Sequence, residues 1–189
     1  QSLPGTKRKG INNIYWNRRM TPVKVAGGGT KVDQAAFTAP MVMPGEYTLK
    51  LKVGDKEYTD KITLVHDMSN TDFTLADREA QHKAAMQMYG MQTELNGLIE
   101  SVNAEQKLLK ENTEKVKNAK AKKVLADYNT QLETLRATLL GTKQKSIFAD
   151  EEELRERLSE VYGTVLMQES KPSNLQLERV EVLQKQLTE

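Results

Sequence analysis

Residues 46–53, Glu-Tyr-Thr-Leu-Lys-Leu-Lys-Val, decide the fold of the first third of the chain. Apolar and polar side chains alternate along this stretch, which is the pattern of a β-strand with one buried face. Gly54-Asp55-Lys56 then supplies a tight turn, and residues 57–65 resume the composition of a strand. The sequence therefore predicts a β-hairpin, which Pro44-Gly45 introduces.

Two further strands are expected upstream, at about 11–18 and near 35–39. Gly27-Gly28-Gly29 lies between them and is expected to form a loop; no Gly-Lys-Ser/Thr follows it, which argues against a phosphate-binding loop. Four or five strands are fewer than the roughly seven of an immunoglobulin-like sandwich. We therefore expect residues 1–67 to form a partial β-sandwich, completed by an upstream domain of the same polypeptide or by a partner chain. Its core anchors would be Trp16, Tyr47 and Leu49.

The apolar period changes from two to helical spacing after Asp67. Amphipathic helices are predicted at about 72–112, 117–141, 150–169 and 173–189. The predicted fold class is therefore α+β. A partial sandwich over 1–67 is followed by a helical domain over 68–189, which is either a four-helix bundle or long helical hairpins.

Charge divides at the same place. The 189 residues carry 28 basic and 26 acidic side chains, a net charge of +2, but residues 1–66 hold +6 and residues 67–189 hold −4.

The absence of cysteine excludes disulfides, zinc-thiolate sites and a thiol nucleophile. No run reaches the roughly 20 apolar residues of a membrane span, and no signal peptide is visible at the first residues. Because the chain does not begin with Met, it is expected to be a piece of a longer protein.

The polar residues predict no catalytic, cofactor-binding or metal-binding site. His66 and His82 fall in different elements, and no nucleophile is aimed at His66-Asp67. The acidic run 150–153 is explained by the dipole of a helix N-terminus better than by a calcium site.

A methionine-rich patch on the first helix is the candidate partner surface: Met86, Met88, Tyr89 and Met91. Methionine adapts to varied partners, although a stripe of this kind also suits a core. Five lysines within 115–123 are expected to form a solvated surface. No nucleic-acid partner is predicted.

Several motifs together carry a family resemblance: Gly10-Ile11-Asn12-Asn13-Ile14-Tyr15-Trp16-Asn17-Arg18-Arg19, then Ala39-Pro40, then Pro44-Gly45-Glu46-Tyr47-Thr48, with Val161-Tyr162-Gly163 and Lys171-Pro172-Ser173 farther on. The chain resembles the C-terminal region of secreted sortilin-like or BNR-repeat β-propeller proteins of Bacteroidetes-type bacteria, often labelled glycosyl hydrolases. The resemblance implies a fibronectin type III-like sandwich with a helical segment, and a periplasmic or extracellular location. Asp67-Met68-Ser69 departs from the family's Asp-Pro-Arg, and no propeller repeat is present.

Three functions are therefore open. The first is a non-catalytic accessory and protein-interaction module at the C-terminal end of an exported propeller protein. The second is a part of a glycosyl-hydrolase-like enzyme whose catalytic residues lie mainly upstream. The third is a free-standing helical adaptor that self-associates. In the first and third, the helices would offer a surface for a protein partner or for dimerisation.

Overall fold

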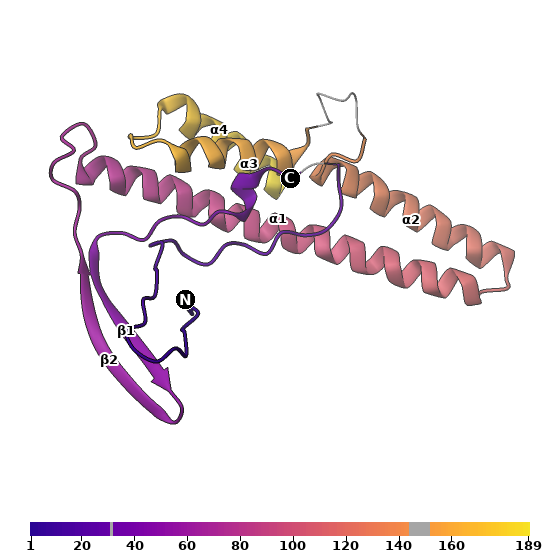
Figure 1. The fold of residues 1–189 in the computed structure, drawn as a ribbon. Coiled ribbons are helices and arrows are strands. Elements are labelled where there is room, and N and C mark those ends of the chain that lie inside the picture. The colour runs from indigo at the N-terminus through magenta and orange to yellow at the C-terminus, as the bar shows by residue number, and fades with distance from the viewer. Residues whose placement is uncertain (31, 144–151) are drawn as a thin grey trace.

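A computed structural model describes residues 1–30, 32–143 and 152–189. In chain order the elements are η1 (a 3₁₀ turn, Gln34–Phe37), β1 (Gly45–Val53), β2 (Lys56–Leu64), α1 (Leu75–Lys115), α2 (Ala119–Leu139), α3 (Leu154–Met167) and α4 (Asn174–Thr188). The long helix α1 forms the axis of the molecule (Figure 1). Helices α3 and α4 lie along its first half, α2 folds back along its second half, and the β-hairpin projects near its N-terminal end.

The predicted hairpin is confirmed. β1 and β2 pair antiparallel from Gly45 opposite Leu64 to Val53 opposite Lys56, and Gly54 takes the turn with a positive φ of 59°. Alternation places most of the charged side chains on one face, where Lys50 pairs with Glu57 at 3.0 Å and Lys61 with Glu46 at 2.7 Å. The opposite face is mainly apolar and largely open to solvent; it carries Tyr47, Leu49, Leu51, Val53, Tyr58 and Ile62, with Asp60 opposite Leu49 and Lys56 opposite Val53.

The predicted sandwich is not observed. In the part of the chain that is described, the sheet has two strands only, and residues 11–18 form none. Ile11, Ile14 and Trp16 do not alternate regularly, and the only strand-like contact nearby is a single bridge between Arg19 and Met41. The strand expected at 35–39 is replaced by η1, because the Asp33 carboxylate accepts a 2.7 Å hydrogen bond from the Ala35 amide and so caps a helical turn.

Of the three expected core anchors, Trp16 and Tyr47 lie near the base of the hairpin and Leu49 lies midway along β1. Trp16 and Tyr47 are half-buried and meet edge to face, with ring centroids 5.3 Å apart. Leu49 is 44% exposed, because within the described ranges no second sheet covers this face of the hairpin.

The four predicted helices are confirmed, with ends shifted by a few residues. α1 begins with a capping box between Thr74 and Asp77 and continues through Gly90 and Gly97 without a break. Its 41 residues span about 60 Å at 1.5 Å per residue. The Asp150 cap expected for the third helix lies outside the described residues, and α3 begins at Leu154 after Glu153.

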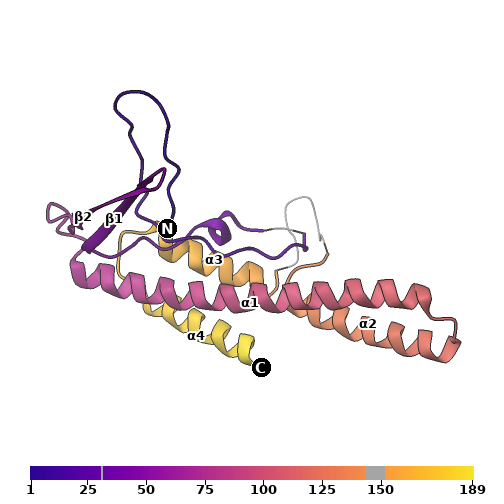
Figure 2. The same ribbon diagram turned by 90° about the horizontal axis from the view of Figure 1, so that it is seen from below.

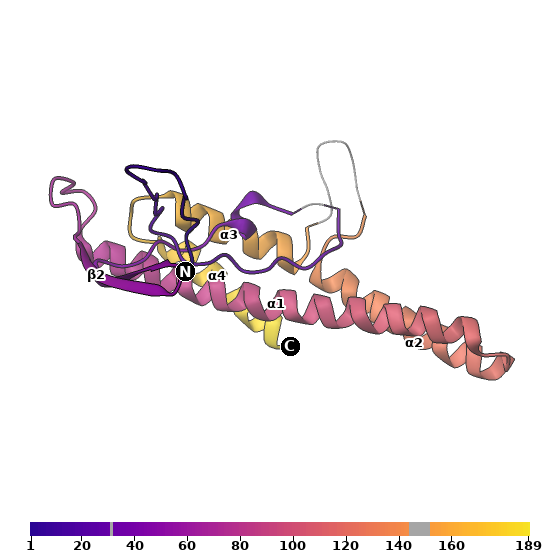
Figure 3. The same ribbon diagram turned by 60° about the horizontal axis from the view of Figure 1, so that its bottom comes forward.

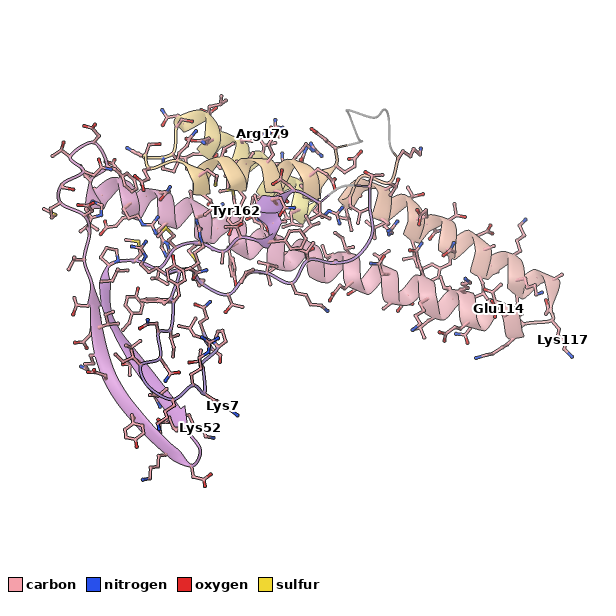
Figure 4. All side chains as sticks on the ribbon, viewed as in Figure 1. Lys7, Lys52, Glu114, Lys117, Tyr162 and Arg179 are labelled. Atoms are coloured by element: carbon pink, nitrogen blue, oxygen red, sulfur yellow. The ribbon has the colours of Figure 1, made fainter. Side chains whose placement is uncertain are left out.

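The first half of α1 packs with α3 and α4 into the main core, which we call the body. Met88, Leu95, Leu158 and Leu183 have at most 1% of their surface exposed in this core. η1 packs against α3, where the Tyr162 hydroxyl donates a 2.8 Å hydrogen bond to the Thr38 carbonyl (Figure 4).

The N-terminal segment runs along the helices. The Ala26 amide donates a buried 2.8 Å hydrogen bond to the Asn96 Oδ1 atom, so the basic N-terminal half touches the helical half well before residue 67. The domain division at 67/68 stays a prediction.

No described helix is both long enough and apolar enough to cross a membrane. Among the same residues, no three His, Asp or Glu side chains gather closely enough to hold a metal ion.

Candidate association surface on the helical arm

The second half of α1 and the whole of α2 form a two-helix projection, residues 98–139, which we call the arm. Figures 2 and 3 show α2 antiparallel to α1 and reaching past the ends of α3 and α4. The turn between the helices is made by Asn118, whose side-chain oxygen accepts hydrogen bonds from the Lys120 and Ala121 amides at the start of α2.

The arm has a small core of its own. Only Val102, Leu109 and Leu132 are buried in it, with Leu125 partly buried against them. A groove of about 490 Å³ opens between the two helices near the tip, with Leu109 and Leu125 among its lining residues. The side chains of the two arm helices therefore do not fill the space between these helices near the tip.

A second apolar row lies exposed beside that core. One row of α2 side chains faces α1: Leu125, Leu132 and Leu139. Because successive residues of a helix are 100° apart, a second row lies next to it on one side: Val124, Tyr128 and Leu135. Their exposed fractions are 61%, 42% and 48%. On the antiparallel α1, the same geometry places the exposed Leu98 and Leu108 on the same side of the arm. The arm thus presents a continuous apolar face, which we call the arm face.

Polar contacts hold the two helices of the arm in register. The Gln106 amide donates a 2.8 Å hydrogen bond to Glu133, and the Arg136 Nε donates a 3.1 Å bond to Asn103. Because these bonds link fixed turns of the two helices, the exposed side chains of α1 and α2 keep a defined spacing.

A glycine segment, residues 27–29, fixes the base of the arm to the body. The Gly27 carbonyl accepts a 3.0 Å bond from Asn103 on α1, and the Gly28 carbonyl accepts a 3.0 Å bond from Arg155 on α3. Arg155 is 3% exposed and pairs at 3.0 Å with Glu156, whose carboxylate also accepts the Gly141 amide. One segment therefore ties together the helices at the point where the arm leaves the body.

Charge is unevenly distributed along the arm. Its tip carries five lysines between residues 115 and 123, with no acidic residue among them. Figure 4 labels Lys117 there, close to Glu114. Toward the body, α1 instead carries the exposed Glu94, one turn before the arm begins, and Glu105, within the first half of the arm.

Residues 118–139, the whole of α2 with its N-cap, match the family model of the NUP57/Nup54 C-terminal domain. Helix α2 is similar to that domain. No curated protein and no solved structure matches the chain.

This finding overturns the resemblance to secreted β-propeller proteins. The match falls on the arm, and the described residues lack the sandwich that the propeller resemblance implied. The propeller-linked accessory function is therefore wrong, and so is the periplasmic or extracellular location, which rested on the same resemblance. A Pro-Gly-x-Tyr hairpin misled because its signal is local, and any amphipathic hairpin satisfies it.

The methionine patch named in the sequence lies on the body. Met88 and Met91 are 0% and 2% exposed in the main core, while Met86 and Tyr89 are half-buried. The Tyr89 hydroxyl donates a 2.8 Å bond to the Thr21 carbonyl of the N-terminal segment. The arm face is not evident from the sequence, because helical spacing places Val124, Tyr128 and Leu135 in the same broad stripe as Leu125 and Leu132. That stripe is wider than one partner helix covers.

The two histidines lie apart. His66 Nε2 is 2.8 Å from the Phe73 carbonyl in the loop before α1. The polar sequence around His82 predicts an exposed side chain, but His82 is half-buried on α1. Burial lowers its pKa, the positive charge of Arg78 lowers it further, and a hydrogen bond with the Met41 backbone opposes both.

Proposed function

We propose that this chain is a helical interaction protein that self-associates, with the arm face of one copy packed antiparallel against the arm face of a second copy. The single observation that carries the proposal is the exposed row of Val124, Tyr128 and Leu135 beside an arm core of only three buried residues. Two such arms would form a four-helix bundle, in which each helix has neighbours on two sides.

Burial favours this arrangement. Each fully buried leucine or similar side chain contributes about 1.5–3 kcal/mol relative to exposure, and a two-fold interface counts every residue twice. The arm face holds five large apolar side chains in each copy, at Leu98, Leu108, Val124, Tyr128 and Leu135. A second copy is a suitable partner because its own arm face is equally exposed, so one contact would bury the apolar side chains of both copies.

Charge favours the antiparallel orientation. A two-fold axis across the middle of the arm would bring the lysine-rich tip of one copy near Glu94 and Glu105 of the other. A parallel orientation would instead bring the two lysine-rich tips together, where like charges repel.

The family likeness points the same way. The helices of the NUP57/Nup54 C-terminal domain mediate association between nucleoporins. Helix α2, the element similar to that domain, carries three of the five arm-face residues.

Sedimentation velocity of the full chain tests the proposal. We expect a dimer, and we expect Leu135→Glu to raise its dissociation constant at least tenfold, because a charge would be buried twice in the interface. Thr130→Glu is the matched control. It adds the same charge at an exposed position on the opposite side of α2 and should leave the dimer intact. A monomeric wild type, or equal weakening by both variants, would contradict the proposal.

A second interaction is supported by the β-hairpin. Its apolar face exposes Leu49, Leu51, Val53, Tyr58 and Ile62, which is more than an isolated hairpin normally leaves uncovered. We propose that further β-strands, from a partner chain or from another part of the same polypeptide, pair with an edge of this hairpin and so extend it into a sheet whose apolar face can be covered. Protected outward-pointing amides of β1 or β2 in hydrogen exchange of the assembled protein would show an added strand; fast exchange along both edges would rule it out.

A further inference from the structure

A cavity of about 350 Å³ lies where the base of the hairpin meets the body, and we call it the junction pocket. It is far from the arm, and nothing in the proposed self-association uses it. Its charged and titratable lining residues are Arg18, Arg19, His66, Asp67, Arg78 and Glu169. Its apolar lining includes Val42, Leu64, Phe73 and Leu166.

Three guanidinium groups converge on this pocket from two parts of the chain. Arg18 and Arg19 come from the N-terminal segment, and Arg78 from the first turn of α1. Among the described residues, none of the three forms an ion pair with a carboxylate, although several surface lysines do. Burial lowers the pKa of Arg78, the nearby positive charge of Arg19 lowers it further, and Glu169 acts in the opposite direction.

The hydrogen bonds of the arginines leave donors free. Arg78 is held by the Gln81 side chain at 2.6 Å and by the Met41 carbonyl at 3.1 Å, and Arg19 donates to the Ala39 carbonyl at 2.8 Å. A guanidinium has five N–H donors, so each keeps some for a ligand. These carbonyl contacts orient Arg78 and Arg19, which is the rigidity that a binding site requires.

The carboxylates beside the pocket compete only weakly for these donors. Asp67 accepts hydrogen bonds from the Ser69 amide at 2.9 Å and from the Ser69 hydroxyl at 2.7 Å, which lower its pKa and turn it toward its own loop. Glu169 is exposed at the rim, after the end of α3.

Arg18 carries backbone strain at this place. It is the one non-glycine residue of the described chain with a positive φ, 58°. Its carbonyl accepts the Val42 amide at 2.8 Å, and the Asn17 side chain accepts the Arg19 amide at 3.0 Å, so the surrounding bonds hold the unusual conformation. Strained residues of this kind concentrate at binding sites.

We propose that the junction pocket binds a small phosphorylated molecule, with Arg18, Arg19 and Arg78 around the phosphate group and the apolar lining against its organic part. Arginine pairs with phosphate oxygens through two parallel hydrogen bonds, and several guanidiniums suit a doubly charged group better than a single carboxylate. The volume is within the range of small-molecule pockets and exceeds what a bare phosphate fills.

The test is isothermal titration of the full chain with phenyl phosphate, inorganic phosphate and benzyl alcohol. Phenyl phosphate should bind more tightly than inorganic phosphate, and benzyl alcohol should not bind. Equal affinity for the two phosphates would overturn the claim that the apolar lining contributes. Binding of benzyl alcohol as tight as that of phenyl phosphate, or no binding of either phosphate, would overturn the site.

Arg18→Asn is the decisive variant, because asparagine tolerates positive φ and removes the guanidinium without adding strain. It should weaken phenyl phosphate binding at least tenfold. Arg179→Asn, on the exposed side of α4, removes the same charge far along the chain and should leave binding unchanged (Figure 4). Equal loss in the two variants would show a diffuse charge effect and would overturn the site.

Discussion

Gly28 and Gly29 show how much of the architecture depends on single residues. Both have positive φ values, 106° and 83°, and a Cβ atom at either position would run into an arginine side chain, Arg136 at Gly28 and Arg155 at Gly29. Glycine alone adopts this backbone without strain and leaves room for two guanidiniums at the base of the arm. Gly28 and Gly29 are therefore required by the packing at the base of the arm.

Gly28→Ala should destabilise the protein by about 1–2 kcal/mol, since an L side chain at positive φ is strained and Arg136 must move. Gly27→Ala is the control on the neighbouring residue, where φ is not positive and a Cβ would meet open space. It should change stability by less than about 0.5 kcal/mol. Urea unfolding of the two variants provides the measurement, and equal effects would show that the segment does not fix the arm.

His82 should make the stability of the protein fall as the pH is lowered. Its folded pKa is lowered, chiefly by burial, so the unfolded chain binds the proton more readily. The contribution of neutral His82 to the free energy of unfolding is therefore fully present above the unfolded pKa of about 6.5, and it is lost as the pH falls below that value. The melting temperature of the wild type should drop more between pH 7.5 and 5.5 than that of His82→Gln. Parallel pH profiles for the two proteins would refute this role.

At the scale of elements, α2 depends on the N-cap residue that precedes it. The Asn118 side chain satisfies two amides that the helix cannot satisfy internally, at Lys120 and Ala121. Asn118→Ala should cost about 1 kcal/mol of stability. Asn129→Ala makes the same replacement at an exposed position inside the helix and should cost little or slightly stabilise. Thermal unfolding of both variants distinguishes a true cap from a general loss of asparagine.

The hairpin and the helices could be predicted because their signals are local. Alternation over 46–53 with a glycine at the turn, and 3–4 spacing after Asp67, need no knowledge of distant residues. The strands expected at 11–18 and 35–39 failed for the opposite reason. A strand needs a partner, and a single carboxylate at Asp33 is enough to turn the second segment into a 3₁₀ turn.

The candidate surface was harder to predict than the helices. Periodicity identifies the apolar side of a helix but not how many neighbours cover it. The body covers Met88 and Met91, whereas α2 packs mainly against α1 and leaves Tyr128 and Leu135 exposed. The junction pocket was invisible as well, since it joins Arg18 to Arg78 across 60 residues of chain.

At the scale of the whole molecule, the proposed dimer should weaken with salt. Its lysine-rich tips would lie near Glu94 and Glu105, and added ions screen such exposed pairs, with a Debye length of about 10 Å at 0.1 M. Raising NaCl from 50 to 500 mM should therefore increase the dissociation constant measured by sedimentation. Lys120→Glu should weaken the dimer at low salt and reduce the salt effect. Tighter association at high salt would indicate parallel arms instead.

The uninterrupted course of α1 gives the dimer a fixed geometry. One helix runs through both body and arm, so the arm cannot swing about a flexible joint. Arms overlapping along the 21 residues of α2 would place the two bodies at opposite ends of a rod, about 30 Å of helix apart. The paired chains would then act as a ruler, holding two hairpins and two junction pockets at a set separation for whatever binds them.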